Sequence, residues 1–128
     1  MPNQTGSNER RRDKRYALQN AIVSMPQVSS LAIGTVLDIS RGGLGVRYPA
    51  QGERLTSRFE IDILLTETNY FITNVPVATV SDFELENQVP FSLFNERRCG
   101  LRFGVLSEAQ TAQLEHVFRD FTDDGITP

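Results

Sequence analysis

The sequence predicts a mainly all-β fold, a small β-barrel with one amphipathic helix packed on it. Two observations carry this prediction. Short apolar runs with a period of two are separated by turn residues, and the apolar period becomes helical only near the C-terminal end. A length of 128 residues allows one buried core. We expect a disordered tail at 1–9, one domain at 10–122 (an arm at 10–15, a barrel at 16–106 and a helix at 107–121) and a tail at 123–128.

The first half of the barrel is expected to contain three strands, over residues 16–25, 28–39 and 44–48. A turn at Pro26 separates the first two, and the second can break near Gly34. The third strand follows the stretch 38–45, Asp-Ile-Ser-Arg-Gly-Gly-Leu-Gly, in which a polar turn with paired glycines joins two apolar runs. Taken alone, this composition is typical of an ordinary hairpin turn.

The second half of the barrel has clearer alternation. Residues 57–65 follow a period of two, and further strands are expected over 70–83 and 99–105. Pro76 predicts an edge or a bulge, because proline cannot donate a ladder hydrogen bond. Residues 84–96 are polar and predict a long surface loop.

A change to helical spacing marks the last element. Ser107 is suited to cap a helix, with Gln110 three residues later as its capping-box partner. Apolar residues then recur on one helical face, at Leu114, Val117, Phe118 and Phe121. The helix is expected to end near residues 122–125.

The reactive side chains give no positive case for an enzyme. His116 is the only histidine and lacks companion ligands, so a surface or partly packed position is expected. Cys99 lies on the apolar face of its strand and is expected to be a small core residue. No Walker, GxGxxG or CxxC pattern is present, and we expect neither a metal nor a cofactor.

The sequence has none of the features of a membrane-inserted or secreted protein. No apolar run approaches the roughly 20 residues that a membrane helix needs, and residues 1–7 contain no apolar leader segment. A single cysteine excludes an internal disulfide, which fits a reducing compartment. We therefore expect a cytoplasmic location.

The charges are unevenly distributed. Residues 1–20 carry five basic and two acidic residues, whereas the rest of the chain carries eight basic and 14 acidic residues. A basic arm on an acidic body indicates a local anionic partner, not a broad nucleic-acid surface. Lys14 is the only lysine among 13 basic residues. Arginine suits bidentate contact with phosphate or guanine, although codon bias would produce the same excess.

The turn at 38–43 adds hydrogen-bonding groups of a different kind. Asp38 supplies a carboxylate acceptor and Ser40 a hydroxyl. A carboxylate accepts from amine donors that a phosphate site does not use. Arginine forks together with a carboxylate therefore indicate a ligand with both anionic and donor groups, such as a guanine nucleotide.

Two motifs give the chain a resemblance to the PilZ domain, the bacterial receptor module for cyclic di-GMP. The RRxxxR arm of that family matches residues 10–15, and its DxSxxG turn matches residues 38–43. The late strand with Gly100, Leu101 and Phe103, followed by the amphipathic helix, also resembles the family's C-terminal end. The resemblance covers the chain from residue 10 to about residue 121.

This resemblance implies a six-stranded antiparallel barrel with one C-terminal helix and a non-catalytic cyclic di-GMP receptor. By position in the motifs, the ligand-binding residues are Arg10, Arg11, Arg15, Asp38, Ser40 and Gly43. Arg11 and Arg15 would contact guanine edges and phosphates. Asp38 and Ser40 would hydrogen-bond guanine, and Gly43 would allow close approach.

The resemblance also implies a stoichiometry. In the family, an arginine at the position of Arg10 is associated with an intercalated pair of ligand molecules, so two cyclic di-GMP per domain are expected. Arg12 can shift the register of the arm by one residue. Arg41 and Arg47 are further candidates by proximity alone. Ordering of the arm would change the surface that an unidentified downstream protein reads.

Two other functions compete with this interpretation. One is a PilZ-like scaffold that binds no ligand and contacts only proteins, against which the complete motifs argue. The other is a small β-barrel that binds single-stranded nucleic acid through its basic arm. Such proteins usually expose aromatic stacking platforms, whereas here Phe59, Phe71, Phe83 and Phe103 mostly fit core positions. The acidic body also disfavours a nucleic-acid partner.

Overall fold

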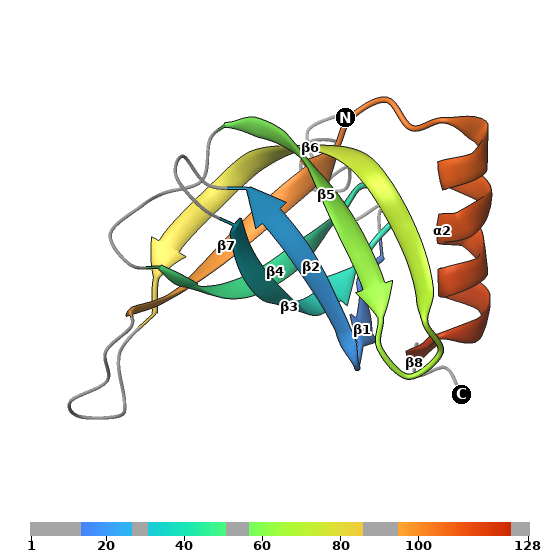
Figure 1. The fold of residues 1–128 in the computed structure, drawn as a ribbon, viewed down its shortest axis with the longest axis horizontal. Helices are drawn as coiled ribbons and strands as arrows, with labels where there is room; N and C mark the ends of the chain where they lie inside the picture. The colour runs from blue at the N-terminus through green and yellow to red at the C-terminus, as the bar shows by residue number, and fades with distance from the viewer. Residues whose placement is uncertain (1–13, 27–30, 51–56, 86–94, 124–128) are drawn as a thin grey trace, which may run out of the picture.

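Six antiparallel strands close into a barrel with one helix beside it (Figure 1). The computed structural model describes residues 14–26, 31–50, 57–85 and 95–123. The strands are β1 (Tyr16–Leu18), β2 (Ala21–Pro26), β3 (Leu31–Ile39), β4 (Gly43–Ala50), β5 (Arg58–Leu65), β6 (Tyr70–Glu84), β7 (Asn95–Phe103) and β8 (Thr122–Asp123), and the helix is α2 (Glu108–Asp120). The order around the ring is β2-β5-β6-β7-β4-β3, and pairing of β2 with β3 closes it. The predicted six-stranded barrel with a C-terminal helix is confirmed.

The prediction of one continuous first strand over 16–25 is wrong, because the chain turns at Asn20. The backbone of Asn20 has a φ of 59°, in the left-handed region that asparagine tolerates better than most residues. The turn divides the segment into β1 and β2, which pair with different parts of β3. Ala17 of β1 lies opposite Asp38, whereas Ile22 of β2 lies opposite Thr35.

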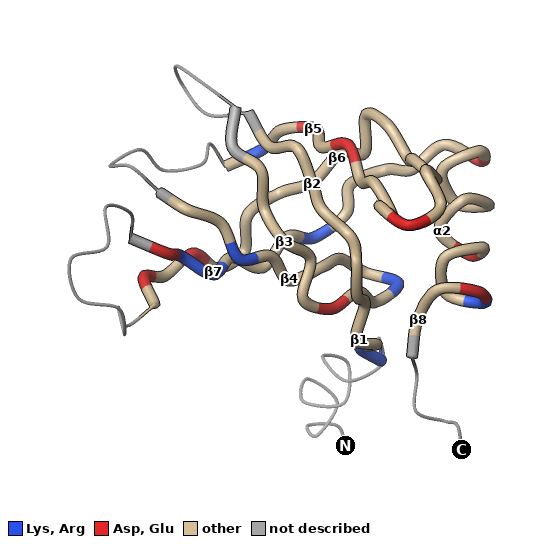
Figure 2. Tube along the Cα trace, turned by 60° about the horizontal axis from the view of Figure 1, so that its bottom comes forward, with Lys and Arg blue, Asp and Glu red and all other residues tan. Residues whose placement is uncertain are grey.

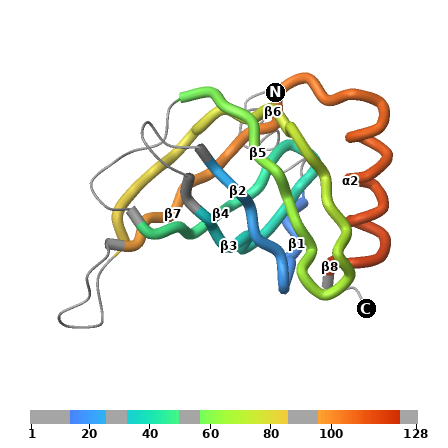
Figure 3. Tube along the Cα trace, in the orientation of Figure 1, coloured from blue at the N-terminus to red at the C-terminus, as the bar shows by residue number. Residues whose placement is uncertain are grey.

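The segment that follows the helix also differs from the prediction. α2 ends at Asp120 with Phe121 as its C-cap, and β8 follows, in which Thr122 pairs with Leu18 of β1. Asp123, predicted to begin a tail, is therefore part of the sheet. Figure 3 shows β1 and β8 side by side, although they come from opposite ends of the chain.

The second predicted strand is not broken at Gly34, since β3 runs through it without a register shift against β2. A Cβ atom at this glycine would lie 2.5 Å from Val46 Cγ1, so the missing side chain lets core side chains approach. The predicted start of this strand at residue 28 lies outside the described residues. The same holds for most of the predicted 84–96 loop, of which Glu84 and 95–96 belong to strands.

A β-bulge in β6 anchors the helix. Ile61 pairs with Val75 but Ile63 pairs with Ile72, so β6 carries an extra residue between these pairs. Asn74 in the bulge has a φ of 55°, and its N–H donates to Asp62 Oδ1 at 2.9 Å. Pro76 follows two residues later and pairs in register with Glu60, so the bulge precedes the proline, and the β6–β7 pairing begins at the next residue, Val77.

α2 packs along β6 through a capped first turn and an apolar face (Figure 1). The predicted capping box is present: Ser107 Oγ accepts from the Gln110 N–H, and Gln110 Oε1 accepts from the Ser107 N–H, both at 3.0 Å. Gln110 Nε2 also donates to the carbonyls of residues 73 and 74 in the bulge. Leu114 and Val117 are buried against the barrel core.

The prediction that the four phenylalanines mostly occupy core positions is half right. Phe59 and Phe103 pack against the buried cluster, but Phe71 and Phe83 are 54% and 50% exposed. Both exposed rings lie on β6, on the outside of the barrel, since the period of two places their neighbours Ile72 and Asp82 on the inner face.

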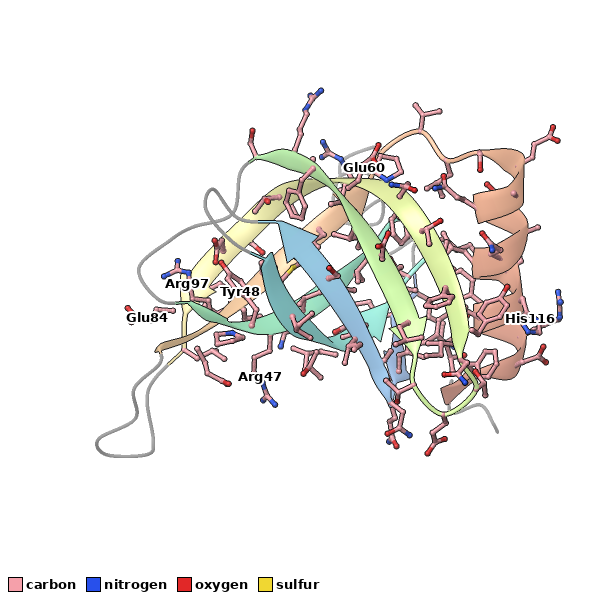
Figure 4. The ribbon with its side chains drawn as sticks, viewed as in Figure 1. Arg47, Tyr48, Glu60, Glu84, Arg97 and His116 are labelled. Atoms are coloured by element: carbon pink, nitrogen blue, oxygen red, sulfur yellow. The ribbon has the colours of Figure 1, made fainter. Side chains whose placement is uncertain are left out.

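A partly buried polar network lies at one end of the barrel, where Figure 4 labels Tyr48 and Arg97. The Tyr48 hydroxyl donates to both carboxylate oxygens of Asp82, at 2.9 and 2.8 Å, and Arg97 Nε donates to Asp82 Oδ1 at 2.8 Å. The Tyr48 side chain is buried. Burial and the adjacent Asp82 carboxylate raise the pKa of the Tyr48 hydroxyl above its ordinary value.

Replacing Tyr48 by phenylalanine should lower the free energy of unfolding by about 1–3 kcal/mol, because Asp82 would lose a donor in a partly desolvated site. Urea denaturation at neutral pH measures this change. Tyr70→Phe is the matched control, since the Tyr70 hydroxyl makes one long hydrogen bond of 3.4 Å to the Gln113 carbonyl. Equal losses in the two variants would contradict a special role for the network.

Candidate functional site

The turn between β3 and β4 is closed by Ser40. The Ser40 N–H donates to the Gly43 carbonyl at 2.8 Å, and the N–H groups of Gly42 and Gly43 donate to Ser40 Oγ at 3.1 and 3.2 Å. The Ser40 residue is only 7% exposed. Its hydroxyl therefore shapes the turn, and its direct contact with guanine stays a prediction.

Two glycines let other groups approach the turn. A Cβ atom on Gly43 would overlap the Leu101 carbonyl oxygen of β7, so the space beside this glycine is taken by the neighbouring strand. A Cβ atom on Gly45 would lie 2.9 Å from Asp38 Oδ1. Gly45 thus makes room for the Asp38 side chain on the outside of the barrel.

Asp38 is the point at which the arm and the turn meet. Arg15 Nη1 lies 2.8 Å from Asp38 Oδ1, and Arg98 Nη2 of β7 lies 3.4 Å from Asp38 Oδ2. The Asp38 side chain is 19% exposed, whereas that of Arg15 is 64% exposed. Residues 23 positions apart in the sequence, one from each motif, are therefore brought into direct contact.

Arg98 was missed by sequence reasoning because it belongs to neither motif. The signal that could have found it is the alternation of β7. Cys99 and Leu101 are buried, so Arg98, Gly100 and Arg102 face outward. Figure 2 shows basic positions along β7 and at β1, whereas α2 carries several acidic positions.

An open cleft adjoins the Asp38 cluster. Its lining includes Arg15, Gly43, Val80, Gly100 and Arg102, from the arm, the turn, β6 and β7. The cleft has a volume of about 230 Å³. Ligand pockets usually span roughly 300–1,000 Å³, so the described residues provide a wall of a site and do not enclose a nucleotide.

Two further candidates already have partners within the molecule. Arg41 forms an ion pair with Glu115 of α2, and its guanidinium lies 4.7 Å from the centre of the Phe118 ring. Arg47 Nε lies 3.3 Å from Glu96 Oε1. Arg41 therefore joins the turn to the helix and does not line the cleft. The predicted arm residues Arg10, Arg11 and Arg12 lie outside the described residues.

The histidine and the cysteine occupy the predicted environments. His116 Nδ1 lies 2.8 Å from Asp120 Oδ2, and the ring packs against Tyr70 and Phe121. Cys99 is fully buried, and burial raises the pKa of its thiol to about 12, which disfavours the nucleophilic thiolate.

Neither a metal cluster nor a membrane span is found in the described ranges. No group of three or more His, Cys, Asp or Glu side chains there is arranged to hold a metal ion. α2, the helix that those ranges contain, is too short and too polar to cross a membrane.

Comparison with known proteins gives one family. The family model described as "PilZ domain" matches residues 9–120 of the chain. No curated protein matches the sequence significantly.

Solved structures resemble the fold at low sequence identity. The PilZ domain of YcgR from Escherichia coli with c-di-GMP has a TM-score of 0.69 and 17% identity, over 88% of this chain and 91% of that chain. The K. pneumonia MrkH–c-di-GMP complex has a TM-score of 0.66 and 15% identity, over 86% of this chain and 51% of MrkH. YcgR from Escherichia coli in complex with c-di-GMP has a TM-score of 0.63 and 20% identity, over 86% of this chain and 45% of that chain. The chain thus spans about half the length of the latter two proteins.

Gly43→Ala should destabilise the protein by about 1–3 kcal/mol, because the new methyl group would overlap the rigid backbone of β7. Gly45→Ala should cost less, because the group it meets is the end of the Asp38 side chain, which can move. Urea denaturation of both variants measures the difference. If the two variants were equally stable, the close approach of β7 to Gly43 would be contradicted.

Proposed function

Since the chain belongs to the PilZ domain family, we propose that it is a non-catalytic receptor for cyclic di-GMP. The observation that carries this proposal is the contact between Arg15 of the arm and Asp38 of the turn at the edge of an open cleft. This contact unites an arginine fork and a carboxylate, the two groups needed for a ligand with phosphates and guanine donors. The c-di-GMP-bound neighbours of like fold support the same ligand.

In this proposal, the arm binds across the barrel wall. Arg10, Arg11 and Arg15 contact phosphates and guanine edges, while Asp38 accepts hydrogen bonds from guanine. Ser40 holds the turn that presents Asp38, through the three turn hydrogen bonds described above. Arg12 takes the place of Arg11 or Arg10 in the ligand contacts if the register of the arm shifts by one residue.

The Arg15–Asp38 pair is weak enough to be exchanged for a ligand. Ion pairs between exposed side chains contribute about 0–1 kcal/mol, and the Arg15 side chain is mostly exposed. Each charge-assisted hydrogen bond to the ligand contributes about 1.5–3 kcal/mol, whereas fixing each arm residue costs roughly 1–2 kcal/mol. Several arginine contacts are therefore needed together, and the loss of one should weaken binding strongly.

The output in this proposal is a changed surface near the helix. The ring of Tyr16, next to Arg15, packs in a tilted arrangement against that of Phe118 of α2, with 5.8 Å between ring centres, and Arg41 of the turn lies over the same Phe118 ring. Ordering of the arm by ligand would therefore change the contacts that Tyr16 and Arg41 make with Phe118 of the helix. A downstream partner protein would read this surface.

Arg15→Ala and Asp38→Ala should each weaken cyclic di-GMP binding by about tenfold to a hundredfold, the loss of one charge-assisted hydrogen bond. Isothermal titration measures the affinity, with GTP and cyclic di-AMP as control ligands. Arg119→Ala, which removes an exposed arginine from the last turn of α2, is the matched control and should bind normally. Absence of binding by the unaltered protein would favour a PilZ-like adaptor that contacts only proteins.

The unaltered protein should bind two cyclic di-GMP molecules per chain, because Arg10 occupies the position that is associated with a ligand pair in the family. Arg10→Leu should lower the titrated ratio from about two to about one while binding persists. A ratio near one for the unaltered protein would withdraw this role of Arg10 and keep the receptor.

A further inference from the structure

The outward face of β7 forms a wall of the cleft with an unusual composition. Gly100 lies opposite Gly45 on β4, and Gly45 lies opposite Asp38 on β3. Neither glycine has a side chain of its own, and a Cβ atom would lie 2.9 Å from Asp38 Oδ1 at Gly45 and 2.8 Å from Ser81 Oγ at Gly100. Arg98 and Arg102 stand two residues to either side of Gly100.

Arg98 is placed where its charge is costly without an anion. It lies directly opposite Arg47 on β4, and like charges in such a cross-strand pair are destabilising. An ion pair with Asp38 offsets this repulsion at Arg98, and an ion pair with Glu96 offsets it at Arg47. Asp38 therefore has one oxygen held by the β7 strand while the other is held by Arg15, which can leave.

Arg102 lines the cleft and is exposed. It pairs through the backbone with Gly43 of the turn, so its position follows that of the DxSxxG segment. Within the described part of the chain, no carboxylate pairs with its guanidinium, in contrast to Arg97, which is held by Asp82. Arg102 is thus a cation on the cleft wall that is available to an anionic ligand group.

We propose that β7 supplies two further residues of the ligand site, namely Arg98, which positions Asp38 toward guanine, and Arg102, which binds a ligand phosphate directly. This inference rests on the proposed cyclic di-GMP receptor function. Arg98 keeps the Asp38 carboxylate oriented through Oδ2 when Arg15 turns to the ligand. Arg102 adds a fixed charge from the barrel to those of the arm.

The two roles predict different responses to a change of base. Cyclic di-IMP lacks the exocyclic amine of guanine and so offers Asp38 one donor fewer. Arg102→Ala should weaken the binding of cyclic di-GMP and of cyclic di-IMP by the same factor, about tenfold or more. Arg98→Ala should weaken cyclic di-GMP binding by about fivefold, the effect of one exposed ion pair, and cyclic di-IMP binding less.

Isothermal titration of the full chain with both ligands tests the proposal, with Arg119→Ala as control and thermal melting to verify folding. In an Asp38→Ala background, Arg98→Ala should have no further effect, and Arg98→Lys should restore part of the affinity in the otherwise unaltered chain. If Arg98→Ala weakened cyclic di-GMP binding as much in the Asp38→Ala background as in the otherwise unaltered chain, the positioning role would be overturned.

Normal affinity of a folded Arg102→Ala variant would overturn the phosphate contact. Failure of the unaltered protein to bind cyclic di-GMP would instead reject the receptor function itself, and these results are distinguishable because the unaltered protein is titrated first.

Discussion

The pairing of β3 with two successive segments is the constraint on which the barrel and the site both depend. β2 pairs with the first part of β3 and closes the ring, while β1 pairs with its last residues. One straight strand could not make both pairings with β3. The left-handed backbone at Asn20 provides the change of direction between β1 and β2. Because β1 follows the arm immediately, this geometry delivers Arg15 to Asp38.

Asp38 and Asp82 show how burial determines the strength of an ion pair. Asp82 and Arg97 have side chains only 13% and 11% exposed, and Tyr48 completes their hydrogen bonds inside the barrel. Breaking such a pair leaves an uncompensated charge and is costly. Asp38 pairs with an arginine that is mostly in water, so breaking this pair costs little.

The helix is attached to the segments that form the site as well as to the barrel core. Phe118 is contacted by Tyr16 from the arm side and by Arg41 from the turn. β8, directly after the helix, extends the sheet through β1. Tyr16 on the arm side and Arg41 in the turn therefore each lie one side-chain contact away from α2.

The sequence by itself determined the fold class, the motifs and the caps, because these depend on local patterns. Alternation located most strands, Ser107 and Gln110 specified the start of the helix, and the RRxxxR and DxSxxG motifs marked two segments that meet at Arg15 and Asp38. Local patterns did not show the break at Asn20, which depends on how a closed ring must bend, or the exposure of Phe71 and Phe83. Only the tertiary structure brought Arg98 to Asp38 and Arg41 to Glu115 of the helix. These contacts join residues 60 and 74 positions apart, and strand register, not sequence spacing, determines which side chains meet.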